Sequence, residues 1–118
     1  MMPVGPATRV YLAAGATDLR KSFEGLSDLV RQRLQQDPLS GHLFVFANRQ
    51  RTRLKLLYWD GSGLWVCAKR IERGRVSWPA TAATESGALR ILAEELTLLV
   101  SGIDLNQTRP RPWWRKAA

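Results

Sequence analysis

A short apolar run in the middle of the chain constrains the fold most. Residues 42–47 are His-Leu-Phe-Val-Phe-Ala, with no carboxylate, lysine or arginine among them. A run of this length and composition, bounded by turn residues, is typical of a strand that is buried on both faces. We therefore expect residues 42–47 to lie at the centre of a sheet.

Before this run, the apolar side chains recur at a helical spacing. The apolar stripe consists of Leu19, Phe23, Leu26, Val30 and Leu34. Steps of three and four residues predict one long amphipathic helix that packs this stripe against the core. Thr17 is the expected N-cap of the helix, and Asp37-Pro38 is expected to end it. Residues 10–13, Val-Tyr-Leu-Ala, favour a first strand ahead of the helix.

After the central run, the apolar side chains change to a spacing of two. Residues 53–59 and 64–71 partly alternate, which predicts two more strands. Asp60-Gly61-Ser62-Gly63 between them is typical of a tight hairpin turn. We expect a further strand at residues 75–78, which Pro79 ends, so that the three strands form a meander.

The last part of the predicted domain is a strand followed by a helix. Residues 88–91 are compatible with a strand or with the start of a helix, and we favour the strand. A short helix over residues 92–100 follows, with Glu94 and Glu95 in its first turn. Residues 80–87 are small and polar and are expected to form a loop.

These elements predict an α+β fold for the 118-residue chain. We expect an antiparallel sheet of about five or six strands, with one long amphipathic helix packed on it and a short C-terminal helix. The single domain is expected to span residues 9–104. A flexible N-terminus, residues 1–8, precedes it, and a basic tail rich in Pro and Trp, residues 105–118, follows in an extended conformation.

The positive charge of the chain is concentrated in two segments. The formal net charge is +8, and residues 49–75 hold eight of the basic residues against Asp60 and Glu72. Residues 106–118 hold four more and no acid. A localised positive field attracts polyanions through phosphate contacts and counterion release. The candidate nucleic-acid-binding residues are Arg49, Arg51, Arg53, Lys55, Lys69, Arg70, Arg73, Arg75, Arg109, Arg111, Arg115 and Lys116.

The meander can gather the first of these segments into one patch. Arg53 and Lys55 are expected on the face of their strand opposite Leu54 and Leu56. Contact with DNA or RNA is the favoured interpretation, and an ordinary solubilising surface is the alternative. Trp113-Trp114 in the tail is a candidate partner-binding site. Three interpretations of the pair stay open: stacking on bases, filling a partner's pocket, or folding back on the domain.

No arrangement of residues in the sequence predicts catalysis. The ten Asp and Glu residues show no converging pattern, and His42 is the single histidine. Neither a metal site nor a nucleophile with its base can be assembled from them. No glycine-rich segment matches a phosphate-binding loop. We therefore predict no catalytic residue, no metal and no cofactor, and the chain is not expected to be an enzyme; a small nuclease is a weaker alternative.

The lone cysteine and the absence of targeting segments favour a cytoplasmic location. Cys67 has no second cysteine with which to pair, which suits a reducing compartment. The N-terminus lacks the basic and apolar parts of a signal peptide, and no apolar stretch is long enough to cross a membrane. No membrane partner is expected.

Several segments, in order, carry a resemblance to a known family. They are Val10-Tyr-Leu, Thr17-Asp-Leu-Arg-Lys, Phe23-Glu-Gly-Leu, Ser40-Gly-His-Leu-Phe-Val-Phe, Leu54-Lys-Leu-Leu-Tyr-Trp-Asp-Gly, Lys69-Arg-Ile-Glu-Arg-Gly-Arg-Val-Ser-Trp-Pro and Gly102-Ile-Asp. Over about residues 9–104, the chain resembles the TnpB-type accessory proteins, the second-reading-frame products of insertion sequence 66 transposons. The resemblance implies a bacterial protein that is needed for transposition beside a larger transposase, which carries the catalytic acids. It assigns no catalytic residue to this chain.

Charge and resemblance together predict an accessory factor for DNA transposition. The expected partners are DNA, bound through its phosphates, and the transposase or other proteins of the same element. The alternative is a pure protein-interaction module that docks on the transposase, or on another accessory protein, without binding DNA. The edge of the sheet leaves a homodimer open.

Overall fold

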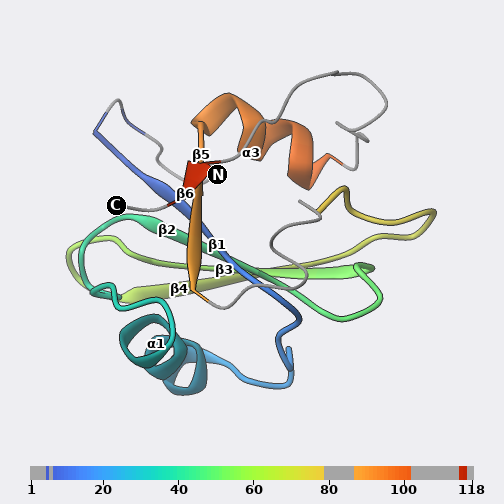
Figure 1. The fold of residues 1–118 in the computed structure, drawn as a ribbon. Coiled ribbons are helices and arrows are strands. Elements are labelled where there is room, and N and C mark those ends of the chain that lie inside the picture. The colour runs from blue at the N-terminus through green and yellow to red at the C-terminus, as the bar shows by residue number, and fades with distance from the viewer. Residues whose placement is uncertain (1–4, 6, 79–86, 102–114, 117–118) are drawn as a thin grey trace.

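The sheet has a helix against each face. The structure, a computed structural model, describes residue 5 and residues 7–78, 87–101 and 115–116. The elements are β1 (Val10–Ala13), α1 (Phe23–Gln32), β2 (Leu43–Ala47), β3 (Arg53–Trp59), β4 (Leu64–Arg70), β5 (Ala88–Ile91), α3 (Ala93–Val100) and β6 (Arg115–Lys116). The strand order is β4-β3-β2-β1-β5-β6. Figure 1 shows α1 on one side of this sheet and α3 on the other.

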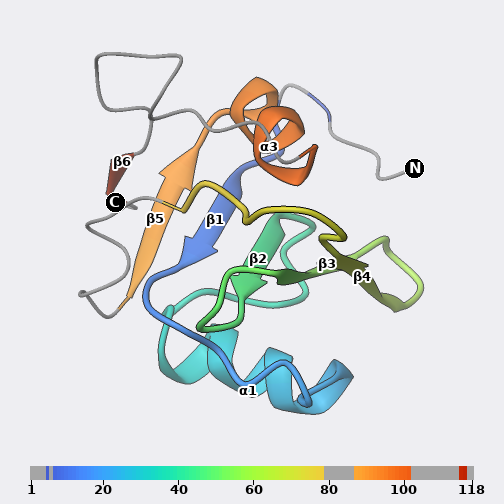
Figure 2. The same ribbon diagram turned by 90° about the vertical axis from the view of Figure 1, so that its right-hand side faces the viewer.

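The central strand is confirmed. All five residues of β2 are buried, and β2 lies between β1 and β3. On one face, Phe44 and Phe46 pack with Tyr11 and with α1. On the other face, Val45 packs in a second cluster that includes residues of α3. The sheet therefore separates two apolar layers, and Figure 2 shows α1 and α3 on its opposite faces.

The sheet is mixed, so the prediction of an antiparallel sheet is wrong. β1 and β2 run parallel, with Tyr11 opposite Phe44, and the other pairs of neighbouring strands are antiparallel. Parallel neighbours cannot be joined by a tight turn and need a crossover connection. Residues 14–42 form this crossover and carry α1 across one face of the sheet.

The predicted start of the long helix is also wrong. α1 has ten residues and begins at Phe23, not after an N-cap at Thr17. The backbone N–H of Thr17 instead donates to the Ala47 carbonyl, 2.8 Å away, at the end of β2. The Asp18 carboxylate accepts the backbone N–H of Arg20 at 3.1 Å. Thr17 is thus tied to the end of β2, and the Asp18 side chain closes a turn with Arg20, so these residues form a loop ahead of the helix.

The helix ends earlier than the sequence suggested as well. Gln35 has a φ of 54°, in the left-handed region, and the backbone N–H of Gln36 donates back to the Val30 carbonyl at 3.0 Å. A reversal of this kind closes the last turn of a helix. The apolar stripe nevertheless serves the predicted purpose, because Leu26, Val30 and Leu34 are buried against the sheet.

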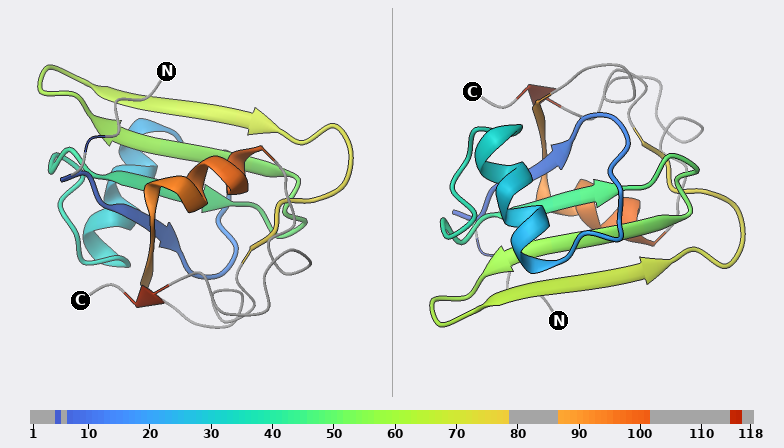
Figure 3. Two further views of the ribbon diagram at one scale, coloured as in Figure 1. Left: turned by 90° about the horizontal axis from the view of Figure 1, so that it is seen from above. Right: turned by 90° about the horizontal axis from the view of Figure 1, so that it is seen from below.

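Only part of the predicted meander is a sheet. β3 and β4 form the predicted hairpin, but residues 75–78 are not a strand. The backbone N–H of Val76 donates to the Arg51 carbonyl at 2.8 Å, and the side chains of Val76 and Trp78 are buried in the cluster that contains α3. This segment therefore covers a face of the sheet, and β4 remains at the edge of the described sheet (Figure 3).

The C-terminal elements follow the prediction. Residues 88–91 form a strand, β5, which pairs with β1, and α3 follows directly. The Glu95 carboxylate accepts the backbone N–H of Leu92 at 2.7 Å and so satisfies a group at the start of α3. The loop predicted from residue 80 and most of the N-terminus and tail lie outside the described residues. Within the described part of the chain, no helix is long and apolar enough to cross a membrane.

The two phenylalanines Phe44 and Phe23 provide a matched test of this core. Phe44 is 0% exposed and stacks on Tyr11 at 5.5 Å between ring centroids, whereas Phe23 is 48% exposed. Phe44→Ala is expected to lower the free energy of unfolding by about 3–5 kcal/mol, through lost burial and a cavity. Phe23→Ala is expected to cost about 1 kcal/mol or less. Urea unfolding of both variants measures the difference, and equal losses would contradict this assignment of the core.

Candidate nucleic-acid interface

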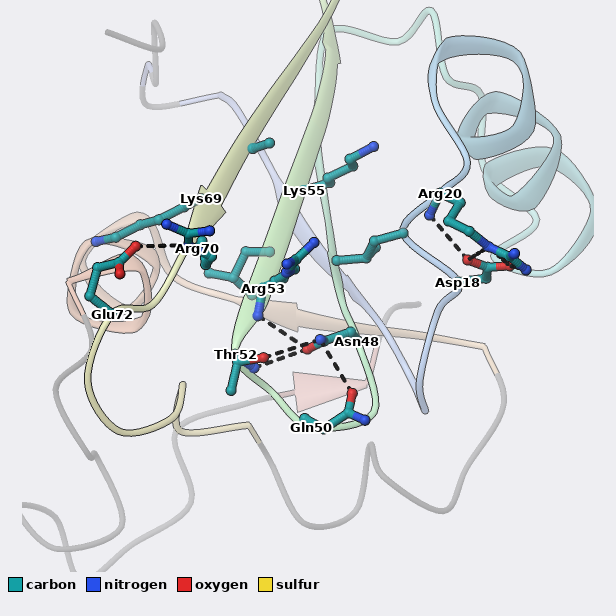
Figure 4. Close-up of a pocket in the computed structure, with 13 residues that line it drawn as sticks. Asp18, Arg20, Asn48, Gln50, Thr52, Arg53, Lys55, Lys69, Arg70 and Glu72 are labelled. Atoms are coloured by element: carbon teal, nitrogen blue, oxygen red, sulfur yellow. Dashed lines mark hydrogen bonds and ion pairs between the residues drawn. The ribbon is translucent and has the colours of Figure 1, made fainter.

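A hollow of about 950 Å³ lies where residues 18–20, 48–55 and 68–72 meet. We call it the basic hollow. The cations that line it include Arg20, Arg53, Lys55 and Arg70, and the acids are Asp18 and Glu72 (Figure 4). These residues come from the start of the crossover, the start of β3 and the end of β4. The pairing of β3 with β4 therefore brings together cations that are far apart in the sequence.

Arg53 and Arg70 are the centre of this arrangement. They lie directly opposite each other in the β3–β4 ladder, and both side chains are exposed. The Arg70 Nε donates to a Glu72 carboxylate oxygen at 2.8 Å. The Arg53 guanidinium has no ion-pair or hydrogen-bond partner within the described ranges of the chain. Like charges directly opposite each other on a sheet are unfavourable, so an anion bound here would relieve their repulsion.

Lys55 and Arg20 border the same hollow from the other side. The Lys55 Nζ donates to the Lys21 carbonyl at 2.9 Å and so ties the loop before α1 to β3. Arg20 forms an ion pair with Asp18 at 2.8 Å. The hydrogen bonds from Arg20 lower the pKa of Asp18 from 3.8 to about 2. The positive charge of Arg20 is therefore partly neutralised, and that of Lys55 is not.

The turn between β2 and β3 is held by one side chain. The Asn48 Oδ1 accepts the backbone N–H groups of Thr52 and Arg53, at 2.9 and 3.1 Å. Arg51 in this turn has a φ of 61°, which is uncommon for a residue with a side chain. The side-chain bonds of Asn48 are a local reason why the chain keeps this conformation.

The turn also divides the predicted patch. Gln50 and Thr52 line the basic hollow, whereas Arg49 and Arg51 line a separate cavity of about 180 Å³ beside Trp78. The sequence predicts that the cations of residues 49–75 form one patch. The structure brings Arg53, Lys55 and Arg70 together and places Arg49 and Arg51 at a neighbouring site.

Lys69 also lines the basic hollow, but its side chain is on the opposite face of β4 from Arg53. Its Nζ donates to the Val100 carbonyl at the end of α3, and Figure 4 shows it pointing towards that helix. The other predicted residues that the structure describes lie outside the hollow. Arg73 and Arg75 are exposed after β4. Arg115 and Lys116 form β6. Four further candidates, Arg109, Arg111, Trp113 and Trp114, lie outside the described residues.

Sequence reasoning missed Arg20 as part of this surface. Its position in the apolar spacing placed it on the outer face of the predicted helix. The useful signal was the sequence Asp18-Leu19-Arg20, because an Asp side chain that accepts the N–H two residues further on is typical of a turn. The structure shows this turn, with the Arg20 guanidinium folded back on the same carboxylate.

The other chemically notable residues have structural partners. The Asp60 carboxylate accepts the backbone N–H groups of Ser62 and Gly63 and the indole Nε1–H of Trp65, at 2.8, 2.9 and 2.7 Å. The bond from the Ser62 backbone, followed by those from Trp65 and Gly63, lowers the pKa of Asp60. Within residues 7–78 and the other described ranges, no three His, Cys, Asp or Glu residues are grouped to hold a metal ion.

Comparisons with known proteins identify the family. The model of the IS66 Orf2-like proteins matches residues 8–110. The uncharacterized protein y4hO of Sinorhizobium fredii (strain NBRC 101917 / NGR234) is 41% identical over 115 residues, which cover 98% of this chain and 96% of that protein. The uncharacterized protein y4jC of the same strain is 36% identical over 111 residues, 92% of each chain. No solved structure gives a significant match.

The chain therefore belongs to the family of IS66 Orf2-like proteins. This confirms the resemblance to the TnpB-type proteins of insertion sequence 66. The family connects the chain with an accessory role in the transposition of such elements.

His42 predicts how the stability of the protein depends on pH. Burial, followed by the charges of Arg9 and Arg90, lowers the pKa of His42 from its ordinary 6.5. The Nδ1 of His42 accepts the backbone N–H of Arg9 at 3.0 Å, which also needs the neutral ring. The unfolded chain therefore binds a proton more readily than the folded protein. The free energy of unfolding is expected to fall as the pH falls below about 6.5.

Urea unfolding between pH 7.5 and 5 measures this effect, with His42→Asn as the reference because asparagine retains a hydrogen-bond acceptor and does not titrate. As the pH falls, the native protein is expected to lose more free energy of unfolding than His42→Asn loses. Asp18, with its pKa of about 2, does not contribute in this window. A difference that stays constant from pH 7.5 to 5 would show that His42 has no such role.

Proposed function

We propose that this protein is a non-catalytic accessory factor in transposition that contacts the phosphates of DNA through the basic hollow. Membership of the IS66 Orf2-like family supports the connection with transposition. The single observation that carries the DNA contact is the pair Arg53 and Arg70, opposite each other on two adjacent strands and both exposed. A third cation, Lys55, lies two residues from Arg53 on the same face of β3.

The geometry of these residues suits a phosphate backbone. Guanidinium groups present planar sets of donors that match phosphate oxygens, and side chains directly opposite on a sheet have Cβ atoms about 4.5–5.5 Å apart. The neutral side chains of Asn48, Gln50 and Thr52 add polar groups at the rim. Contacts of this kind fix the position of a protein on DNA and do not by themselves read its sequence.

The acids at the hollow support a binding role rather than catalysis. Asp18 and Glu72 each hold an arginine, with N–O distances of 2.8 Å. The divalent ions that nucleases and transposases employ need several converging oxygen ligands, whereas these two carboxylates belong to separate ion pairs. In this proposal, the acids for strand transfer belong to the transposase, and this protein contributes a positively charged surface beside it.

Removing the two central arginines tests the proposal. Arg53→Gln/Arg70→Gln is expected to weaken DNA binding and to reduce the slope of log Kd against log salt by about 2, because each lost phosphate contact removes about 0.9 from that slope. Fluorescence anisotropy with a labelled duplex at several salt concentrations measures both quantities. Urea unfolding of the same variant checks that its fold is retained.

The matched control is Arg9→Gln/Arg31→Gln, which removes the same charge elsewhere. Arg31 is exposed on α1 and pairs with Asp28, and Arg9 precedes β1 at the end of the sheet opposite the start of β3. This control is expected to bind DNA nearly as well as the native protein. Equal losses of DNA affinity in the two double variants would show that the basic hollow is not the DNA-binding site. No DNA affinity at low salt would favour the alternative of a module that binds only the transposase.

A further inference from the structure

The edge strand β4 is open to a further strand. Only β3 pairs with it among the described strands (Figure 3). The backbone N–H of Ile71 donates to the Thr52 carbonyl at 2.7 Å, and the Gly63 carbonyl accepts the N–H of Asp60 at 3.1 Å. The direction of backbone groups alternates along a strand, so the odd-numbered residues of β4 bond to β3. The even-numbered residues, Leu64, Val66, Ala68 and Arg70, direct their N–H and C=O groups outwards.

The side chains of β4 are distributed unevenly along it. Its sequence is Leu-Trp-Val-Cys-Ala-Lys-Arg, with large apolar residues at one end and two cations at the other. Trp65 is 51% exposed, and Ala68 is exposed as well. Edge strands are commonly protected by being very short or by carrying charged side chains. β4 has seven residues, and its two cations stand at one end, so residues 64–68 carry no charge.

We propose that two copies of the protein pair through β4, antiparallel and centred on Cys67, to form one continuous sheet. In this register, Trp65 lies opposite Lys69 of the second copy, and Leu64 lies opposite its Arg70. Val66 lies opposite Ala68 of the second copy. Every outward N–H and C=O group of the even-numbered residues then meets a partner.

Charge selects this arrangement over the others. A parallel, in-register pairing would place Lys69 and Arg70 beside the same two cations of the second copy, and like charges side by side repel. The antiparallel pairing places them at opposite ends of the shared ladder. A centre at Cys67 pairs all seven residues of β4. Moving the centre to Ala68 would leave Leu64 and Trp65 outside the ladder, and moving it to Val66 would leave Lys69 and Arg70 outside.

Trp65 is already held in the conformation that the pairing needs. Its ring is stacked on Tyr58, at 6.3 Å between centroids and 7° between planes, and its Nε1–H donates to Asp60 at 2.7 Å. Trp65 and Lys69 lie on the same face of β4, because they are four residues apart on a strand. A cation beside a fixed indole ring is a favourable contact, and the ring loses no conformational freedom on binding.

The pairing has a consequence for the basic hollow, although it does not rest on it. The two-fold axis of such a pair is perpendicular to the sheet, so both copies present the α1 face, and hence both hollows, on the same side. The dimer would form even if the hollow bound no DNA. The two proposals can therefore fail separately.

The experiment combines mass measurement with cross-linking at Cys67. The native protein at tens of micromolar is expected to have twice its chain mass of 13.3 kDa by light scattering after gel filtration. Mild oxidation is expected to give a covalent dimer, because residues opposite each other at a non-hydrogen-bonded position have Cα atoms about 4.5 Å apart, within the range of a disulfide. Cys67 is the single cysteine, so any such bond reports the register. Oxidation in urea gives the background rate.

Two variants test the ladder and its register. Ala68→Pro removes an outward N–H without touching the bonds to β3, and is expected to give a monomer. Trp65→Lys places like charges opposite each other and is expected to weaken the dimer at least tenfold, whereas Trp65→Lys/Lys69→Glu is expected to restore it. Cys67→Ala is the control that dimerises without cross-linking.

A native protein that is monomeric at these concentrations would overturn the proposal. A dimer that cross-links no faster than in urea, or that is unaffected by both Ala68→Pro and Trp65→Lys, would show that the copies meet elsewhere and would overturn it equally. If Ala68→Pro does not fold, the comparison of Trp65→Lys with Trp65→Lys/Lys69→Glu still tests the register.

Discussion

The burial of β1 and β2 is the constraint on which the rest of the structure depends. All of their residues are inaccessible to water, so their backbone N–H and C=O groups must be paired within the sheet. Each strand therefore needs a neighbour on both edges, which β5 and β3 supply. Each face also needs an apolar cover. α1 covers one face, and α3 with residues 76–78 covers the other.

The same constraint builds the basic hollow. The C-terminal end of β2 accepts a hydrogen bond from Thr17, which fixes the loop that contains Asp18 and Arg20. The next residues after β2 form the turn held by Asn48, which sets the start of β3. Two segments that are about thirty residues apart are thus anchored at one end of one buried strand. Arg53, Lys55 and Arg70 lie on two paired strands, and this favours a precise electrostatic surface.

The periodicity of the sequence was sufficient to predict most of the individual helices and strands. It was not sufficient to predict how they pair and connect. The central position of residues 42–47 and the separation of Arg53 and Lys55 from Leu54 and Leu56 follow from local patterns, and the structure has both. The parallel pairing of β1 with β2, the loop after Thr17 and the course of residues 75–78 depend on distant partners. The bonds that decide them join Thr17 to Ala47 and Val76 to Arg51. The grouping around Arg53 depends likewise on the pairing of β3 with β4.

The position of β1 in the sheet limits the order in which the strands can pair while the chain is being synthesised. β1 lies between β2 and β5, and its residues pair with residues 43–45 on one side and 88–91 on the other. The β2–β3–β4 hairpins can form while the chain is still emerging from the ribosome, since their contacts are local. One edge of β1 must stay unpaired until β5 has been released. A nascent chain thus carries an unsatisfied, strongly apolar strand through most of its translation, and truncation before residue 91 would leave that strand open to wrong partners.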